Sequence, residues 1–301
     1  MTIGFDPQIA RRTWMTLEPI HGMVYFSPHG TPIYDAAGLE GRQHYFASRA
    51  AAFGRVSAEV VTSTFFNFSP SLVRTAMATV WDRVSPEEAL AARLRVVDAS
   101  LREAAPDLIG NDATNRAAEL ATSAARSACG RVDGKPLFAA HVSLAWPTEP
   151  HLVLWHAQTL LREYRGDLHI ALLLSEGLSG LDALITHGAT GAVPLALLQQ
   201  LRGWSADEWD AGVESLRSRG ILTAGDVALT ASGAALRQRV EDRTDELSTD
   251  AWAVLGEEGC RELRAAARPL SAAVIDAGWS PLRRLPPGEI GRASCRERVC
   301  T

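Results

Sequence analysis

The chain has 301 residues, 47% of them hydrophobic, and a formal net charge of −5. This length and apolar content suffice for one large or two smaller globular domains, and they exclude intrinsic disorder. The charges are spread without long blocks of one sign, which excludes a polybasic membrane anchor and an acidic tail. Lys135 is the single lysine among 30 lysine and arginine residues, a bias typical of GC-rich bacterial genomes.

The first 177 residues have helical hydrophobic spacing throughout. Residues 85–88, with the sequence Ser-Pro-Glu-Glu, supply a capping hydroxyl, a proline at the first helical position and acids near the positive helix end. Loop-like connectors are expected at 111–112 and 130–136. We therefore expect a helical domain over 1–177, with helices at 7–17, 20–26, 39–52, 57–67, 70–81, 86–104, 113–129 and 149–176.

Residues 178–248 predict three helices, two β-compatible runs and a fourth helix, the element order of a winged-helix domain. Ser205 and Glu208 form a capping box at the start of the third helix. The runs 221–223 and 227–230 flank a three-residue loop, which predicts a β-hairpin wing. The expected fold is mainly α, with a helical N-terminal domain packed on a winged-helix domain that carries this short wing.

The third helix of this domain is the one that would enter a DNA groove. Trp209, Val213 and Leu216 are spaced to form one buried stripe on this helix. The opposite, outward face then carries Asp207, Asp210, Glu214 and Arg217. Over 178–248 there are six arginines and ten acidic residues, a net charge of 6 − 10 = −4. Because DNA affinity depends on neutralising phosphates, this charge disfavours DNA.

The C-terminal region divides into a helical segment over 249–288 and a tail over 289–301 that resembles a translated sequencing adapter, so the native C-terminus is expected to differ beyond about Gly288. With the tail set aside, Cys129 and Cys260 remain and are expected to be buried free thiols. No signal segment or apolar run of about 20 residues occurs, which favours a cytoplasmic location without a membrane.

The predicted helix at 149–176 carries the richest chemistry. Leucines cover most of its circumference, so it should lie in a core, yet it also carries His156, Arg162, Glu163, Arg165 and His169. Buried charges need partners. Either these side chains form an internal salt-bridge network, or they line a polar pocket for a ligand.

A second polar set lies near the N-terminus, where Glu18, His21 and Tyr25 share one helical face. A carboxylate beside a histidine could raise its basicity for general-base chemistry. The alternative, which we favour, is a half-buried histidine satisfied by the carboxylate, because no activated nucleophile lies nearby.

Several chemistries find no support in the sequence. It contains no dinucleotide-binding glycine fingerprint, phosphate loop, nucleophile elbow, Cys-x-x-Cys pair or His-Glu-x-x-His motif. His156 and Glu163 are seven residues apart, whereas metal co-ligands on a helix are normally three or four apart. We therefore predict no metal, no cofactor and no catalytic residue.

Five short segments carry a resemblance to a known family. They are LEPIH at 17–21, AEVVT at 58–62, LWHA at 154–157, TLLRE at 159–163 and RGDLH at 165–169. Together with the predicted winged helix ending near 243–245, they resemble an uncharacterised family of actinobacterial helix-turn-helix proteins, over nearly everything before the tail. The resemblance implies a mostly helical fold with a winged helix, and no activity or catalytic residue.

Three functions stay open. The leading hypothesis is a sensor or regulatory protein that binds a small molecule and contacts a protein partner, or a second copy, through its winged helix. The second is a DNA-binding transcriptional regulator of the multiple-antibiotic-resistance repressor type, contacting phosphates through Arg202, Arg217 and Arg219. The third is a cofactor-free enzyme with His156 or His21 as a base. The candidate ligand-binding residues are Glu18, His21, Tyr25, His156, Arg162, Glu163, Arg165 and His169.

Overall fold

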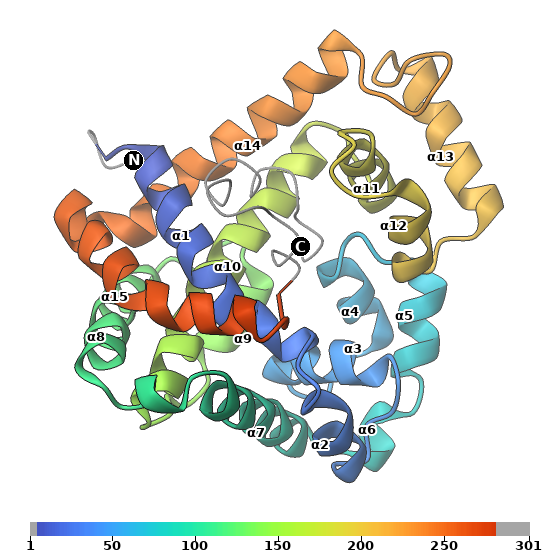
Figure 1. Cartoon of the computed structure of the whole chain (residues 1–301). Helices are drawn as coiled ribbons and strands as arrows, with labels where there is room; N and C mark the ends of the chain where they lie inside the picture. Colours follow the sequence, from blue (N-terminus) through green and yellow to red (C-terminus); the bar gives the residue numbers. More distant parts are fainter. Residues whose placement is uncertain (1–4, 281–301) are drawn as a thin grey trace.

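The computed structural model describes residues 5–280, and the regular elements within this range are all helices (Figure 1). The α-helices are α1 (Pro7–Gly22), α2 (Gly30–Ala36), α3 (Gln43–Ala50), α4 (Ala58–Thr64), α5 (Pro70–Met77), α6 (Val80–Arg83), α7 (Pro86–Ala104), α8 (Asp112–Ala128), α9 (Pro136–Val142), α10 (Pro150–Ser175), α11 (Gly180–Gly188), α12 (Leu195–Arg202), α13 (Ala206–Ser218), α14 (Ala231–Trp252) and α15 (Gly256–Asp276). The predicted mainly α fold is confirmed.

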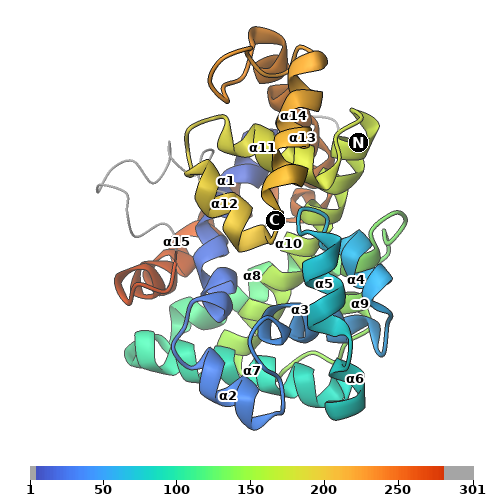
Figure 2. The same ribbon diagram turned by 90° about the vertical axis from the view of Figure 1, so that its right-hand side faces the viewer.

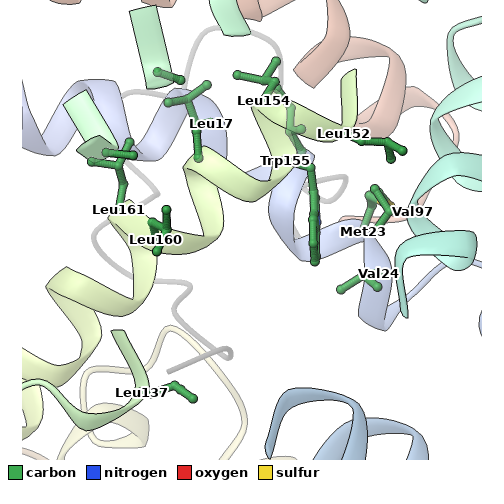
Figure 3. Packing of buried hydrophobic residues seen from close by; sticks show 14 of the residues in the cluster. Leu17, Met23, Val24, Val97, Leu137, Leu152, Leu154, Trp155, Leu160 and Leu161 are labelled. Carbon is green, nitrogen blue, oxygen red and sulfur yellow. The ribbon is translucent and has the colours of Figure 1, made fainter. Parts of the chain in front are cut away.

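Helix α10 is the central element, and α1, α7, α8, α9 and α14 pack against it. Leu154 and Leu160 have no exposed surface, and Trp155 is almost fully covered (Figure 3). Leu17 of α1 and Val97 of α7 belong to the same hydrophobic cluster. This cluster unites α1–α10, the end of α14 and α15, and we call these elements the body.

A second hydrophobic cluster holds α11, α12 and α13 together. Leu173 at the end of α10 and Leu236 and Val240 at the start of α14 belong to this cluster. Helices α11–α13 therefore sit between two long helices that both run into the body, as Figures 1 and 2 show. We call residues 178–230 the module.

The start and orientation of the third module helix are as predicted. Ser205 and Glu208 form the capping box of α13. Trp209, Val213 and Leu216 are buried, while the acidic residues Asp207, Asp210 and Glu214 are exposed. The capping hydroxyl of Thr230 likewise begins α14.

The predicted two-stranded wing is wrong. Within residues 5–280 no strand forms, and the expected hairpin is reduced to one isolated antiparallel bridge between Leu222 and Leu229. The runs have no room to extend, because α13 ends just before Ile221 and Thr230 already caps α14. The Thr230 amide donates to the Ile221 carbonyl and the Thr223 amide donates to the Ala228 carbonyl. These two hydrogen bonds make the single bridge, and the chain beyond Thr230 is already helical.

Two helices in the N-terminal half were missed, and one predicted break is absent. The predicted helices at 7–17 and 20–26 form a single helix through Pro19, followed by a short 3-10 turn. Proline removes only one backbone donor, and the buried neighbours Leu17 and Ile20 hold the helix in place. Helices α2 and α9 occupy segments for which no helix was predicted, since each is only seven residues long and neither begins with a capping side chain.

Helices α8 and α10 lie within two residues of the ranges predicted for them, and α7 matches its range of 86–104. Helix α15 lies inside the expected C-terminal helical segment, whereas the adapter-like tail over 289–301 lies outside the described residues. Among residues 5–280, no single helix is long and apolar enough to cross a bilayer; α10 and α11, bent by 97°, pass that test only as a pair.

Candidate functional site

A cavity of about 80 Å³ lies where the module meets the body. Helix α10 contributes the largest share of its lining, which includes Arg162, Glu163, Arg165, Asp167 and His169. The module contributes side chains of α11 and α12, and α14 adds Arg237 and Glu241. The cavity therefore lies between the two hydrophobic clusters and is lined by residues of both.

One wall of the cavity is aromatic. It consists of Trp14, Tyr45, Phe65, Phe66 and Phe68. Phe65, Phe66 and Phe68 directly follow α4. The helix ends at Thr64, and Phe65 has a non-helical backbone conformation. Phe65 and Phe68 are buried, and their segment also lines the cavity.

The aromatic segment is also where the module docks. Trp204 donates its indole N–H to the Asn67 carbonyl at 3.0 Å, and the Ser69 amide donates to the Arg202 carbonyl at 2.8 Å. The Arg202 guanidinium carbon lies 4.3 Å from the centre of the Phe68 ring. These contacts fix the position of α12 against the body.

A buried ion-pair chain forms the floor on the α3 side. Arg49 donates to both Glu163 carboxylate oxygens, at 2.8 and 3.1 Å, and both side chains are only 4% exposed. Arg162 bridges Glu163 at 3.3 Å and Glu18 at 3.0 Å. Burial opposes ionisation of Glu163, but the two arginines outweigh it and lower its pKa to about 2. Both arginines of this chain are thus held by carboxylates.

A second ion-pair group connects α10, α14 and α1. Arg165 and Arg11 bind the two oxygens of Asp245, at 2.7 and 2.6 Å. Glu241 lies 3.6 Å from Arg165 and 3.5 Å from Arg11. The Arg165 guanidinium also covers the ring of Trp14 at 4.9 Å. The network predicted as one alternative exists, and five of its members also line the cavity: Arg49, Arg162, Glu163, Arg165 and Glu241.

Asp167 is a cavity carboxyl whose pKa is shifted toward neutrality. Burial raises its pKa to about 7, although the amide of Phe138 donates to it at 2.9 Å and stabilises the charged form. Near neutral pH its carboxyl group is therefore partly protonated, and it is able to donate as well as accept a hydrogen bond.

Five of the eight candidate ligand-binding residues lie at the cavity or directly behind it. Arg162, Glu163, Arg165 and His169 line the cavity, and Glu18 stands behind Arg162. His169 also forms a 3.0 Å hydrogen bond with Thr244 of α14. Helix α10 brings these groups together because its polar residues cluster in its second half.

The remaining three candidates lie elsewhere. His21 is fully buried, stacks on Trp155 and hydrogen-bonds Thr159 and Tyr25. Its expected carboxylate partner, Glu18, pairs with Arg162 instead. Burial, reinforced by nearby arginines, lowers the pKa of His21 well below its usual range, opposite to the basicity that a Glu–His pair would give.

His156 is also separate from the cavity. Its ring meets Trp146 edge to face at 4.7 Å, and its Nε2 is buried with no hydrogen-bond partner in the described part of the chain. Burial lowers the His156 pKa to about 4. This histidine is neutral at physiological pH.

The three arginines of the DNA-contact alternative are engaged within the protein. Arg202 is buried against Phe68 and lines the cavity. Arg217 donates to the carbonyls of Thr223 and Gly225, and Arg219 donates to Asp182 and the Gly177 carbonyl. Each is thus used to hold a turn or a helix junction.

No pattern in the sequence indicated that Arg49, Arg237 and Glu241 would line a cavity. They come from helices with ordinary amphipathic spacing, so only tertiary packing reveals their position.

In the described residues no group of three or more His, Cys, Asp and Glu side chains is arranged to hold a metal. Cys129 is partly exposed, Cys260 is buried, and both are free thiols.

Comparison with known proteins gives one match. A family described as a helix-turn-helix family matches residues 10–281, which include the body and the module. No curated protein and no solved structure matches the chain.

Proposed function

Because the chain belongs to this helix-turn-helix family, we propose that it is a regulatory protein whose module contacts a partner under the control of a small molecule bound in the cavity. One observation carries the proposal: the cavity is lined by both the body and the module. A ligand in the cavity touches both the body and the module. A ligand that binds one relative arrangement of body and module more tightly than another shifts the population toward the arrangement that it binds.

The charge of the module favours a protein or a second copy of the chain as the partner. The outward side of α13 presents Asp207, Asp210 and Glu214. Phosphates would be repelled there, whereas a basic protein surface would be attracted. In this proposal the module is a winged-helix variant with only a bridge in place of the wing.

The small-molecule part can be tested by native mass spectrometry. The protein is incubated with a bacterial metabolite extract and compared with A183W, in which an indole fills the cavity from α11. We expect a bound small molecule on the wild type and none on A183W. The control is A196W, because Ala196 is exposed on α12; a wild type that retains nothing, or an A183W that retains the same mass, contradicts the proposal.

Family membership favours one second candidate, a DNA-binding regulator. It is tested by fluorescence anisotropy with a labelled duplex at about 50 mM salt, where contacts to phosphate are strong. The acidic face of α13 predicts no binding by the protein alone. Binding that weakens steeply with added salt would favour the repressor alternative.

The enzyme alternative has less support. His156 and His21 are buried and neutral, and His21 is saturated by Thr159 and Tyr25. We expect H156A to change thermal stability and leave ligand retention unchanged; loss of a ligand or of a turnover in that variant would restore His156 as a functional residue.

A further inference from the structure

We propose that the ligand of the cavity is a small uncharged molecule with one aromatic ring and a hydroxyl or N–H donor, bound with its ring against the aromatic wall and its donor on the Asp167 carboxyl group. The proposal rests on the proposed function and assigns the chemical class of the molecule that this site takes.

The volume of the cavity limits the ligand to about one ring. Drug-sized molecules occupy pockets of about 300–1,000 Å³, whereas this cavity encloses about 80 Å³. A dry cavity of about 150 Å³ accommodates benzene. The space therefore suits a single ring that is partly inserted between the module and the body.

The aromatic wall favours a flat ligand. Phe65, Phe66 and Phe68 line the cavity together with Trp14 and Tyr45. Rings of this kind pack well against another ring, edge to face or offset, and such pairs are more stable than their buried area alone would make them. An aliphatic chain would lose this contribution.

The charge of the lining disfavours a cation. The cavity is lined by five arginines and three acidic residues, a formal charge of 5 − 3 = +2. Two of the acidic residues, Glu163 and Glu241, are already paired with arginines. In a site shielded from water, like charges repel one another more strongly than they do at the surface. A positively charged ligand would therefore be repelled.

The positive excess does not supply a binding group for an anion, because the protein itself engages all five arginines. Arg49, Arg162 and Arg165 bind carboxylates at 2.8, 3.0 and 2.7 Å. Arg202 and Arg237 are held by the Phe68 ring, by the Thr186 hydroxyl and by further contacts within the protein. An anion would have to displace one of these partners, and a displaced buried carboxylate would lose the charge that compensates it. An uncharged ligand displaces none of them.

Asp167 is the polar group that remains available to such a ligand. In the part of the chain that the structure describes, its carboxyl group accepts from the backbone amides of Phe138 and Leu137 and forms no ion pair. A carboxylate has about four acceptor sites, so these two amides leave acceptor capacity on a side chain that lines the cavity and is 5% exposed. A hydroxyl or N–H of the ligand would supply a hydrogen bond to this acceptor, and an ionised acceptor makes such a bond roughly twice as strong.

The test uses four single-ring probes: phenol, anisole, benzoate and benzamidinium. Anisole has the shape of phenol without its donor, and the other two carry opposite charges. Each is titrated into the full chain by isothermal calorimetry, up to about 10 mM because ligands of this size bind in the micromolar to millimolar range. The buffer is at about pH 8, where the Asp167 carboxyl group is mostly ionised and phenol is uncharged.

We expect phenol to bind at least about tenfold more tightly than anisole, because anisole cannot donate to Asp167. Benzoate and benzamidinium should give no binding heat. Equal affinity for phenol and anisole overturns the assignment of the donor to Asp167. Absence of phenol binding, or binding of either ion as tightly as phenol, overturns the proposal as a whole.

Variants locate the ring and its donor. D167N removes the carboxylate at nearly constant size, and D210N removes an exposed carboxylate of α13 as the control. We expect phenol affinity to fall at least about fivefold in D167N and to stay unchanged in D210N. A183W should abolish phenol binding, whereas A196W should retain it. Equal affinities in D167N and D210N, or undiminished binding in A183W, contradict the assignment. The comparison of phenol with anisole uses the wild type, so it decides the question even if D167N does not fold.

The outcomes separate this proposal from the proposed function. If phenol fails while a metabolite still binds the wild type and not A183W, the ligand class is wrong and the regulatory function stands. If neither phenol nor any metabolite binds, both proposals fail.

Discussion

Arg49 and Glu163 are 114 positions apart in the sequence, yet their side chains form a two-pronged ion pair in the interior, with nitrogen–oxygen distances of 2.8 and 3.1 Å. The pair connects α3 to the central helix α10. The Arg49 guanidinium also lies 4.6 Å from the centre of the Phe65 ring, so the pair supports the aromatic wall. One contact thus joins the structural core to the lining of the candidate site.

Removing one partner of this pair should be costly. E163Q leaves the buried Arg49 without its carboxylate, and we expect a loss of about 3–5 kcal/mol in the free energy of unfolding. R49M should cost less, because Arg162 still pairs with Glu163 at 3.3 Å. Chemical denaturation measures it. The double variant R49M/E163M should recover part of the loss, because no uncompensated charge remains.

The exposed pair Arg74–Glu59 provides the control, since both side chains are more than half exposed. R74A should leave the unfolding midpoint nearly unchanged. Equal losses in R74A and R49M would contradict the role assigned to burial.

Asp167 should make stability depend on pH in a specific direction. Its folded pKa of about 7 lies above its ordinary value of 3.8, so between these values the folded state binds a proton that the unfolded state lacks. Its contribution is fully present below pH 3.8 and is lost as pH rises through 7. The slope approaches about −1.4 kcal/mol per pH unit between pH 5 and 6 and falls to about half of that at pH 7.

The comparison with D167N isolates this contribution. His21, His141 and His156 have lowered pKa values, and below pH 6.5 their titration makes stability rise with pH in both proteins. Denaturation at several pH values should give a difference between wild type and D167N that falls as pH rises from 5 to 7. A constant difference would show that Asp167 is ionised throughout.

The helices that the sequence revealed are those with explicit signals. Ser85 and Ser205 are capping residues with a glutamate three positions on, and both capping boxes form. The missed helices, α2 and α9, are as short as the predicted α4, but no side chain caps their first turn as Ser57 does in α4. The failed wing shows a different limit: its runs have β-compatible residues, but the end of α13 and the start of α14 leave room between them for a single bridge.

The candidate site was partly predictable for a similar reason. Charged residues on a leucine-rich helix required partners, which correctly directed attention to Arg162, Glu163 and Arg165. Their partners Arg49 and Asp245 come from distant helices and carry no local signal. The pairing of Glu18 with His21 failed because helical spacing shows which residues share a face, whereas the choice of partner depends on what packs opposite, here Arg162.

Gly180 should be essential for docking the module. A Cβ atom there would lie 1.7 Å from the carbonyl oxygen of Phe66, which is backbone and cannot move aside cheaply. G180A should therefore loosen α11–α13 and increase their hydrogen exchange, while α8 stays protected. G225A is the control, because a Cβ at Gly225 meets nothing within 4 Å; similar exchange in the two variants would contradict close docking.

Trp209 should hold the module together from inside. It is 6% exposed, and it packs in the second cluster with Val213 and Leu216. W209A should cost about 3–5 kcal/mol, the usual range for removing a buried large aromatic side chain. D210A, on the exposed side of the same helix, should cost far less.

Because the second cluster shares α10 and α14 with the body, we expect W209A to lower the thermal midpoint of the whole protein in one transition. Two separate transitions by calorimetry would instead show that the module unfolds without the body.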